Sequence, residues 1–174
     1  PEGGFAQDEF KTTKIVLRRI SPGTFKLHNE TTTSIFASYY IGLFEVTQRQ
    51  YELVMGTNPA TGTSVGNKYP VYNVSYDNIR GSSKGAQWPT SKEVDATSFI
   101  GRLRTRTSLD FDLPTEAQWE YACRAGTTTA YYWGDSMNGG YAWYISNSGS
   151  TAHEVGLKGA NAWGLYDMVG NLQE

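Results

Sequence analysis

Short stretches of apolar and β-branched residues in the first quarter of the chain predict strands. Residues 14–20 (KIVLRRI) are apolar and branched enough for one strand, and residues 37–46 (ASYYIGLFEV) form the strongest strand pattern. Between them, the triplet Ser-Pro-Gly at residues 21–23 predicts a turn, after which residues 24–28 (TFKLH) alternate polar and apolar positions. We therefore expect the first strand and residues 24–28 to pair as a hairpin.

Three helices are predicted from N-terminal capping boxes, in which a Ser or Thr and a Glu or Gln three residues later satisfy each other's backbone N–H groups. Thr47, Thr90 and Thr115 each begin such a pair. The first helix is expected to end at Gly56 and the third at Gly126, because glycine accepts the left-handed conformation common after a helix. Four apolar residues of the second helix share one face: Ala96, Phe99, Ile100 and Leu103.

The remaining sequence is rich in Gly, Asn, Ser, Thr and Pro, and it predicts long loops over residues 56–70 and 76–89. From Thr127 onward, short aromatic segments separated by turns suggest further short strands. No repeat of fixed period and no linker divides the chain, so residues 1–174 are expected to form one domain, with residues 1–21 as an N-terminal extension and first strand. Few helices and long loops around small sheets favour an α+β fold.

Composition supports loops that are held in place by large side chains. The 174 residues include 12 Tyr, 7 Phe, 5 Trp and 19 Gly, and aromatic enrichment of this kind can also mark a binding surface. The net charge is −2 and the sequence has no basic stripe, so nucleic acid is not an expected partner. No apolar run approaches the ~20 residues of a membrane helix, so membrane contact is not expected either.

The usual catalytic side chains form no recognisable motif. His28 and His153 stand far apart in sequence and belong to no metal-binding pattern, so both are interpreted as structural. Cys123 is the only cysteine, which excludes a disulfide within the chain and a zinc site built from cysteines. Its place in the third predicted helix, on the face of Trp119, predicts a buried and inert thiol.

The last eight residues (DMVGNLQE) hold two acids around a Gly-Asn pair. A hard cation such as calcium prefers carboxylate and carbonyl oxygens in an irregular loop. Asp167 and Glu174 would supply the carboxylates, and Gly170 permits a sharp bend. A simple Gly-Asn turn with two solvated acids explains the same residues, and on this pattern alone it is the favoured interpretation.

Five motifs in a consistent order resemble one family, and the two most specific are LPTEAQWEYACRAG and NAWGLYDMVGN. The motifs lie at residues 39–59, 69–77, 110–127, 131–135 and 161–174. They resemble the formylglycine-generating enzyme or sulfatase-modifying-factor family, and the resemblance covers roughly residues 22–174. The resemblance implies an α+β variant of the C-type lectin fold, with little regular secondary structure and long loops fixed by aromatic residues.

The resemblance also implies bound calcium. One family site uses a side chain at the position of Asp167, carbonyls at those of Gly170 and Leu172, and a carboxylate at that of Glu174, and all four match in type here. This match reverses the preference for a solvated turn. A second family site begins with an asparagine whose place is taken here by Trp143, so that site is expected to be lost.

For catalysis, the resemblance implies a copper ion held by two cysteines, which oxidises a substrate cysteine to formylglycine with oxygen. Those cysteines lie in the last third of the family's domain, beyond the position of Glu174, whereas Cys123 corresponds to a structural position in the helix. The chain is therefore expected to lack its C-terminal third. It is expected to hold copper only if such a segment supplies the cysteines.

Three functions follow from the resemblance. The favoured one is a non-catalytic module that binds a protein or peptide, with glycan as another ligand class. The alternative is the N-terminal part of an active oxidase that converts cysteine to formylglycine. A branch of the family that binds non-haem iron is disfavoured, because it takes His ligands from an additional helical domain. A missing segment would expose apolar surface, so a dimer or a completing chain is expected, and calcium favours an extracytoplasmic or secreted location.

Overall fold

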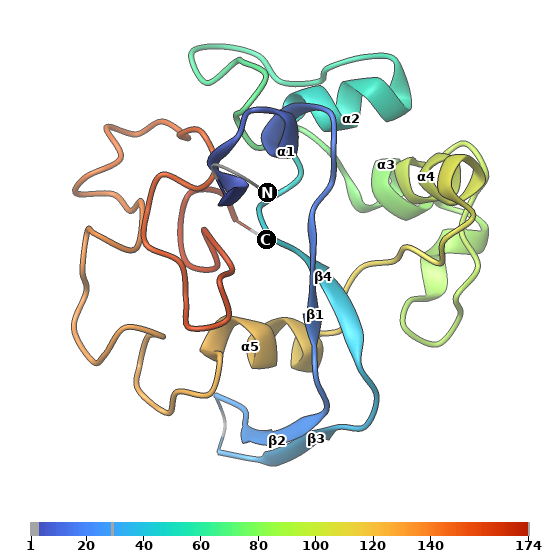
Figure 1. Cartoon of the computed structure of the whole chain (residues 1–174). Coiled ribbons are helices and arrows are strands. Elements are labelled where there is room, and N and C mark those ends of the chain that lie inside the picture. Colours follow the sequence, from blue (N-terminus) through green and yellow to red (C-terminus); the bar gives the residue numbers. More distant parts are fainter. Residues whose placement is uncertain (1–3, 29, 174) are drawn as a thin grey trace.

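Regular elements are few and short, and most of the chain is irregular loop (Figure 1). The computed structural model describes residues 4–28 and 30–173. The strands are β1 (Leu17–Ile20), β2 (Gly23–Lys26), β3 (Thr32–Ile35) and β4 (Tyr39–Gly42). The helices are η1 (Gly4–Ala6), α1 (Glu9–Thr12), α2 (Gln48–Met55), α3 (Tyr76–Arg80), η2 (Lys84–Gln87), α4 (Phe99–Thr107) and α5 (Glu116–Arg124). Within these described residues, no helix has the length and apolar character needed to cross a bilayer.

Two antiparallel sheets of two strands each make up the β structure. β1 pairs with β4, with Leu17 opposite Gly42 and Ile20 opposite Tyr39. β2 pairs instead with β3, so the predicted hairpin between the first strand and residues 24–28 is wrong. An alternating pattern shows that a segment suits a strand, but it does not show which neighbour receives its hydrogen bonds. The polar strand β3 was not predicted at all.

Two of the three predicted capping boxes are confirmed. The hydroxyls of Thr47 and Thr115 each accept a hydrogen bond from the backbone N–H three residues on, at 3.3 Å in both cases. α2 ends as expected before Gly56, whose φ is 87°. α5 ends at Arg124, and the left-handed residue that follows it is Ala125, one position before the predicted Gly126. Local signals therefore placed both helices within a residue.

The remaining predicted helix starts later than expected, because α4 is capped by Ser98 rather than by Thr90. The Ser98 hydroxyl accepts from the backbone N–H three residues on at 3.1 Å. The carbonyls of Ser91 and Glu93 accept hydrogen bonds from the guanidinium of Arg80, at 3.2 and 3.1 Å. A helix through residues 91–93 would compete for those carbonyls, so this tertiary contact removes the first predicted turns.

A further capping box starts α3 inside residues 76–89, which were predicted as loop. Ser75 Oγ accepts from Asn78 N at 3.2 Å, and Asn78 Oδ1 accepts from Ser75 N at 2.9 Å. The predicted capping boxes have Glu or Gln as the returning partner. Asparagine fills the same role here, which is why the signal was missed.

The long segment after α5 holds isolated bridges in place of strands. Tyr131 pairs with Gly134 and Trp143 pairs with Gly170, and within the described residues from Thr127 onward no further pairing occurs. The predicted short aromatic strands in this segment are therefore wrong. Side-chain packing holds these loops, which form the orange and red half of Figure 1.

Buried apolar side chains form two clusters. The first lies where the strands meet α5 and the C-terminal segment: Ile20, Ile35, Leu43, Tyr121, Ala122, Tyr132, Leu165 and Met168. The second joins α2 to α4: Tyr51, Val54, Phe99, Ile100 and Leu103. Three residues of the predicted apolar face thus reach the core, whereas Ala96 lies exposed ahead of the helix.

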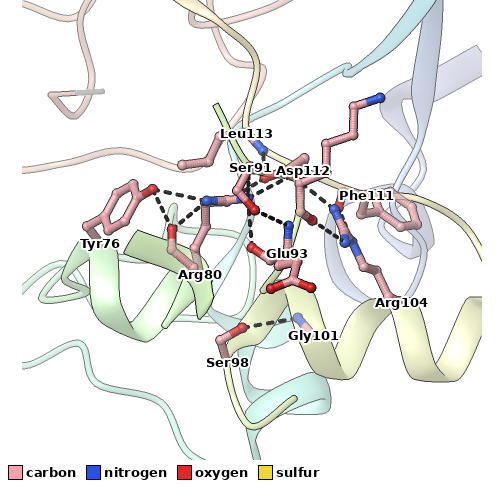
Figure 2. Close-up of polar contacts among 12 residues, drawn as sticks. Tyr76, Arg80, Ser91, Glu93, Ser98, Gly101, Arg104, Phe111, Asp112 and Leu113 are labelled. Carbon is pink, nitrogen blue, oxygen red and sulfur yellow. Dashed lines mark hydrogen bonds and ion pairs between the residues drawn. The ribbon is translucent and has the colours of Figure 1, made fainter. Parts of the chain in front are cut away.

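A buried arginine ties α3, α4 and the segment before α5 together (Figure 2). Arg80 is 0% exposed and donates to both carboxylate oxygens of Asp112, at 2.7 and 3.0 Å. Asp112 Oδ2 also accepts from Arg104 Nη2 at 2.9 Å. Because these charged groups satisfy one another inside the protein, we interpret this cluster as structural rather than catalytic.

Candidate functional site

The C-terminal turn that the sequence predicts as a cation site is built from left-handed backbone. Asp167, Gly170 and Asn171 have φ values of 56°, 87° and 63°. The N–H of Asn171 donates to the carbonyl of Trp143 at 3.1 Å, which docks the turn on a neighbouring loop. A Cβ at position 170 would lie 2.1 Å from that carbonyl oxygen, so only glycine fits at this contact.

Asp167, the side chain proposed as a metal ligand, points into the protein and is 3% exposed. Its Oδ2 accepts a hydrogen bond from Gly156 N at 2.6 Å. Burial raises the pKa of Asp167, and the Gly156 N–H and the Lys11 ammonium oppose that shift. Burial likewise lowers the pKa of Lys11, which Asp167 opposes. Desolvation therefore outweighs the compensation that the protein gives this carboxylate.

Glu45 organises the other side of the turn. Its carboxylate accepts from Asn171 Nδ2 at 2.7 Å and from the backbone N–H of Leu172 at 3.3 Å. The Asn171 side chain also binds the neighbouring loop: its Nδ2 donates to the His153 carbonyl at 3.2 Å, and its Oδ1 accepts from the His153 N–H at 2.9 Å. Glu45 was not among the residues predicted for this site. The available signal was an acid within the otherwise apolar segment LFEV.

The donor set fits calcium in part. The buried and incompletely compensated carboxylate of Asp167 is the feature that suits a cation. Gly170 is exposed, Leu172 is half-buried and bound through its N–H to Glu45, and Glu174 lies outside the described residues. Within the described part of the chain, no three His, Cys, Asp or Glu side chains group as a metal site. The expected family set draws half of its ligands from backbone carbonyls instead.

Trp143 stands between a lysine and a histidine beside the turn. Its ring stacks on His153 with a centroid separation of 3.6 Å, and Lys158 Nζ lies 3.6 Å from the indole centroid. His153 is fixed further by a hydrogen bond of 2.9 Å between its Nε2 and the carbonyl of Ser148. These contacts support the structural interpretation of His153. The indole Nε1 is buried without a hydrogen-bond partner among the described residues.

A second aromatic stack lies on the loop that follows α5. Trp133 stacks on Tyr131, with ring centroids 4.8 Å apart, and on Tyr141, with centroids 5.4 Å apart. Tyr132 meets the edge of the same indole at 4.6 Å and is itself buried in the first core. Trp133 and Tyr141 also pack against the first core, so the stack is fixed in place, and Tyr131, Trp133 and Tyr141 are each half-buried.

The remaining predicted residues take structural places. The Cys123 thiol is half-buried rather than buried as predicted, packs beside the first core and donates to the Met168 carbonyl at 3.3 Å, and its inertness stays a prediction. His28 is largely exposed, with its Nδ1 3.2 Å from Glu120 Oε2. Neither residue lines one of the two clefts described next.

The part of the surface that the structure describes includes two open clefts. A cleft of about 290 Å³ lies beside the C-terminal turn and is lined by Thr61, Gly62, Thr63, Ser64, Tyr72, Ser150, Thr151, Ala152 and Leu172. A larger cleft of about 510 Å³ lies between β1, α5 and the loop after residue 160, and it is lined by Arg18, Arg19, Ile20, Ser21, Tyr121, Asn161, Ala162, Trp163 and Gly164. Neither cleft was anticipated from the sequence.

Comparison with protein families matches residues 4–174 to the sulfatase-modifying factor enzyme 1-like domain. The chaperone protein LppX of Paenibacillus barcinonensis is 29% identical over 173 residues, covering 79% of this chain and 61% of that protein. The formylglycine-generating enzyme of Mycobacterium tuberculosis is 43% identical over 75 residues, covering 36% of this chain and 25% of that enzyme. The chain thus spans less than two thirds of either relative.

The solved structure of Treponema denticola variable protein 1 superposes with a TM-score of 0.67 and 27% identity. The match covers 90% of this chain and 70% of that one. It agrees with the predicted α+β fold of few regular elements. The relation to the C-type lectin fold stays a prediction of the family resemblance.

Proposed function

Because the chain belongs to the sulfatase-modifying factor enzyme 1-like family, we propose that it acts as a non-catalytic binding module for a protein or peptide. The observation that carries the proposal is the stack of Tyr131, Trp133 and Tyr141 on one anchored loop. Stacked tyrosine and tryptophan rings give a partner large contact area, and little conformational entropy is lost because the rings are already held.

The thiol chemistry supports the same proposal. The copper chemistry expected from the family resemblance requires two thiolates, and the sequence contains one cysteine. The Cys123 thiol donates to the Met168 carbonyl, and the side chain packs against the first core. The residues in hand therefore supply binding surfaces more readily than a redox centre.

A second candidate function is the N-terminal part of an oxidase that converts cysteine to formylglycine. The observation in its favour is the 43% identity to the mycobacterial formylglycine-generating enzyme over 75 residues. The two candidates differ in one measurable product. A Cys-x-Pro-x-Arg peptide incubated with this chain, copper and oxygen is expected to keep its cysteine, as read by mass spectrometry. Conversion to formylglycine would establish the oxidase and contradict the non-catalytic proposal.

Binding is tested with peptides selected from a phage-displayed random library. We expect Tyr131→Ala to raise the Kd of a selected synthetic peptide tenfold or more in calorimetry. Truncating an interface aromatic often costs more than about 1–2 kcal/mol of binding free energy. Tyr40→Ala is the matched control, since Tyr40 is 63% exposed on β4 rather than on the stack. Equal losses in the two variants, or no selected ligand, would contradict the proposal. A glycan array and sedimentation of the chain alone would reveal glycan, a second copy or a completing chain as the occupant instead.

We also propose that calcium binds at the C-terminal turn, through Asp167 and the expected partners Gly170, Leu172 and Glu174. A cation that binds the folded state stabilises it by mass action, so millimolar calcium is expected to raise the Tm in differential scanning fluorimetry. Asp167→Ala should abolish the increase, and magnesium should give a smaller one because it demands a tighter octahedral site. Asp110→Ala, at an exposed acid, is the control and should keep the full response. An unchanged melting curve for the parent chain in excess calcium would end this proposal.

A further inference from the structure

The larger cleft has the electrostatic character of an anion site. Its walls include two arginines and no acidic residue. Arg18 and Arg19 are adjacent in β1, but they differ in their contacts. Arg19 Nη2 donates to Ser38 Oγ at 2.7 Å. Within residues 4–28 and 30–173, Arg18 has neither a hydrogen-bond acceptor nor an ion-pair partner, although it is half-buried.

The surrounding backbone leaves room for that unpaired guanidinium. Gly164 has φ of 76°, and a Cβ there would lie 2.7 Å from Arg18 Nη2. The left-handed turn favours glycine at this position, and the missing Cβ leaves room for the end of the arginine side chain. A half-buried guanidinium loses part of its hydration, and here no hydrogen bond from the described residues replaces it. A bound anion would supply charge-assisted hydrogen bonds in its place.

Two aromatic side chains, Trp163 and Tyr121, line the same cleft. Trp163 meets the Tyr121 ring edge to face, with centroids 4.9 Å apart and an interplanar angle of 72°. The backbone of Trp163 is fixed because its N–H donates to Asn161 Oδ1 at 3.0 Å. Asn161 is itself buried and held by α5. The indole is thus half-buried and fixed at a wall of the cleft that Arg18 also lines.

We propose that this cleft binds an organic carboxylate carried on an aromatic or apolar body. The planar fork of Arg18 suits the two oxygens of a carboxylate, and Trp163 and Tyr121 suit the apolar body. A phosphate dianion fits less well, because the lining offers one unpaired guanidinium and no lysine. The inference is independent of the proposed function, since the cleft contains none of Tyr131, Trp133 and Tyr141.

Two probes separate the sources of such a carboxylate: N-acetyl-phenylalanine, which mimics a peptide C-terminus, and 3-phenylpropionate, a free acid. N-acetyl-phenylalaninamide is the neutral control. We expect calorimetry and ligand-observed NMR to show both acids binding at least tenfold more tightly than the amide, because a hydrogen bond between charged groups is stronger than a neutral one. Tighter binding of N-acetyl-phenylalanine would identify a peptide C-terminus, and equal binding would identify a free acid; either result supports the site.

Variants place the binding in the cleft. Arg18→Gln is expected to raise the Kd of both acids about tenfold or more. The Tm should stay nearly unchanged, because the substitution removes no side-chain hydrogen bond or ion pair of Arg18 with a described residue. Arg49→Gln, at a surface pair with Glu52, is the matched control and should leave the Kd within twofold. Three outcomes would overturn the proposal: no acid binding at millimolar concentration, equal binding of the amide, or an unchanged Kd in Arg18→Gln. Tighter binding of phenyl phosphate than of 3-phenylpropionate would likewise exclude a carboxylate site.

Discussion

Asp112→Ala is expected to lower the free energy of unfolding by about 3–5 kcal/mol, because breaking a buried ion pair leaves an uncompensated charge in the interior. Arg80 is 0% exposed, and both oxygens of Asp112 accept from it. The same carboxylate also accepts a hydrogen bond from Arg104, so this one substitution removes the ion-pair partner of two arginines. The free energy of unfolding of a single domain is typically about 5–15 kcal/mol, so this variant should be only marginally stable.

Urea unfolding followed by circular dichroism measures this loss. Asp110→Ala is the control, since Asp110 is exposed two residues earlier and makes no ion pair with a described residue. Its substitution should change stability by less than about 0.5 kcal/mol, as is usual for surface sites. If Asp112→Ala lost no more than this control, the Arg80 cluster could not be holding α3, α4 and the segment before α5 together.

Asn161→Ala is expected to cost on the order of 3 kcal/mol, because its amide satisfies four backbone groups and each buried group left unpaired costs about 1–3 kcal/mol unless water reaches it. The Nδ2 group donates to the carbonyls of Ala122 and Cys123 at 2.8 and 3.1 Å. The Oδ1 atom accepts from the N–H groups of Trp163 and Leu165 at 3.0 and 3.1 Å. The amide thus joins the end of α5 to the C-terminal segment.

Asn138→Ala is the matched control for this substitution. Asn138 is exposed, and its side chain accepts one local hydrogen bond from Gly140 N at 2.8 Å. Thermal and urea unfolding should therefore show a small change for Asn138→Ala and a large one for Asn161→Ala. Similar changes in both would mean that the four contacts of Asn161 add no net stability. Carboxylate binding to the larger cleft should weaken in Asn161→Ala as well, since Asn161 positions Trp163.

The candidate site was only partly predictable. Asp167 and Gly170 were found as a pair because a nearby glycine and acid are visible in eight consecutive letters of sequence. The direction of the Asp167 side chain, toward Gly156 and away from solvent, was not visible. Nor was the carboxylate of Glu45, which reaches Asn171 from 126 residues away in the chain. Nothing near Glu45 in sequence indicates that contact.

By itself, the sequence determined the features that depend on neighbouring residues. The caps of α2 and α5 form between residues three apart, so Thr47 and Thr115 could be read directly. The tertiary structure alone decided which strands pair, where α4 begins and which charges meet. Arg80 draws the carbonyls of Ser91 and Glu93 away from a helix that local preference allows. Such contacts depend on the balance of burial and hydrogen bonding over the whole chain, and a local sequence pattern does not predict that balance.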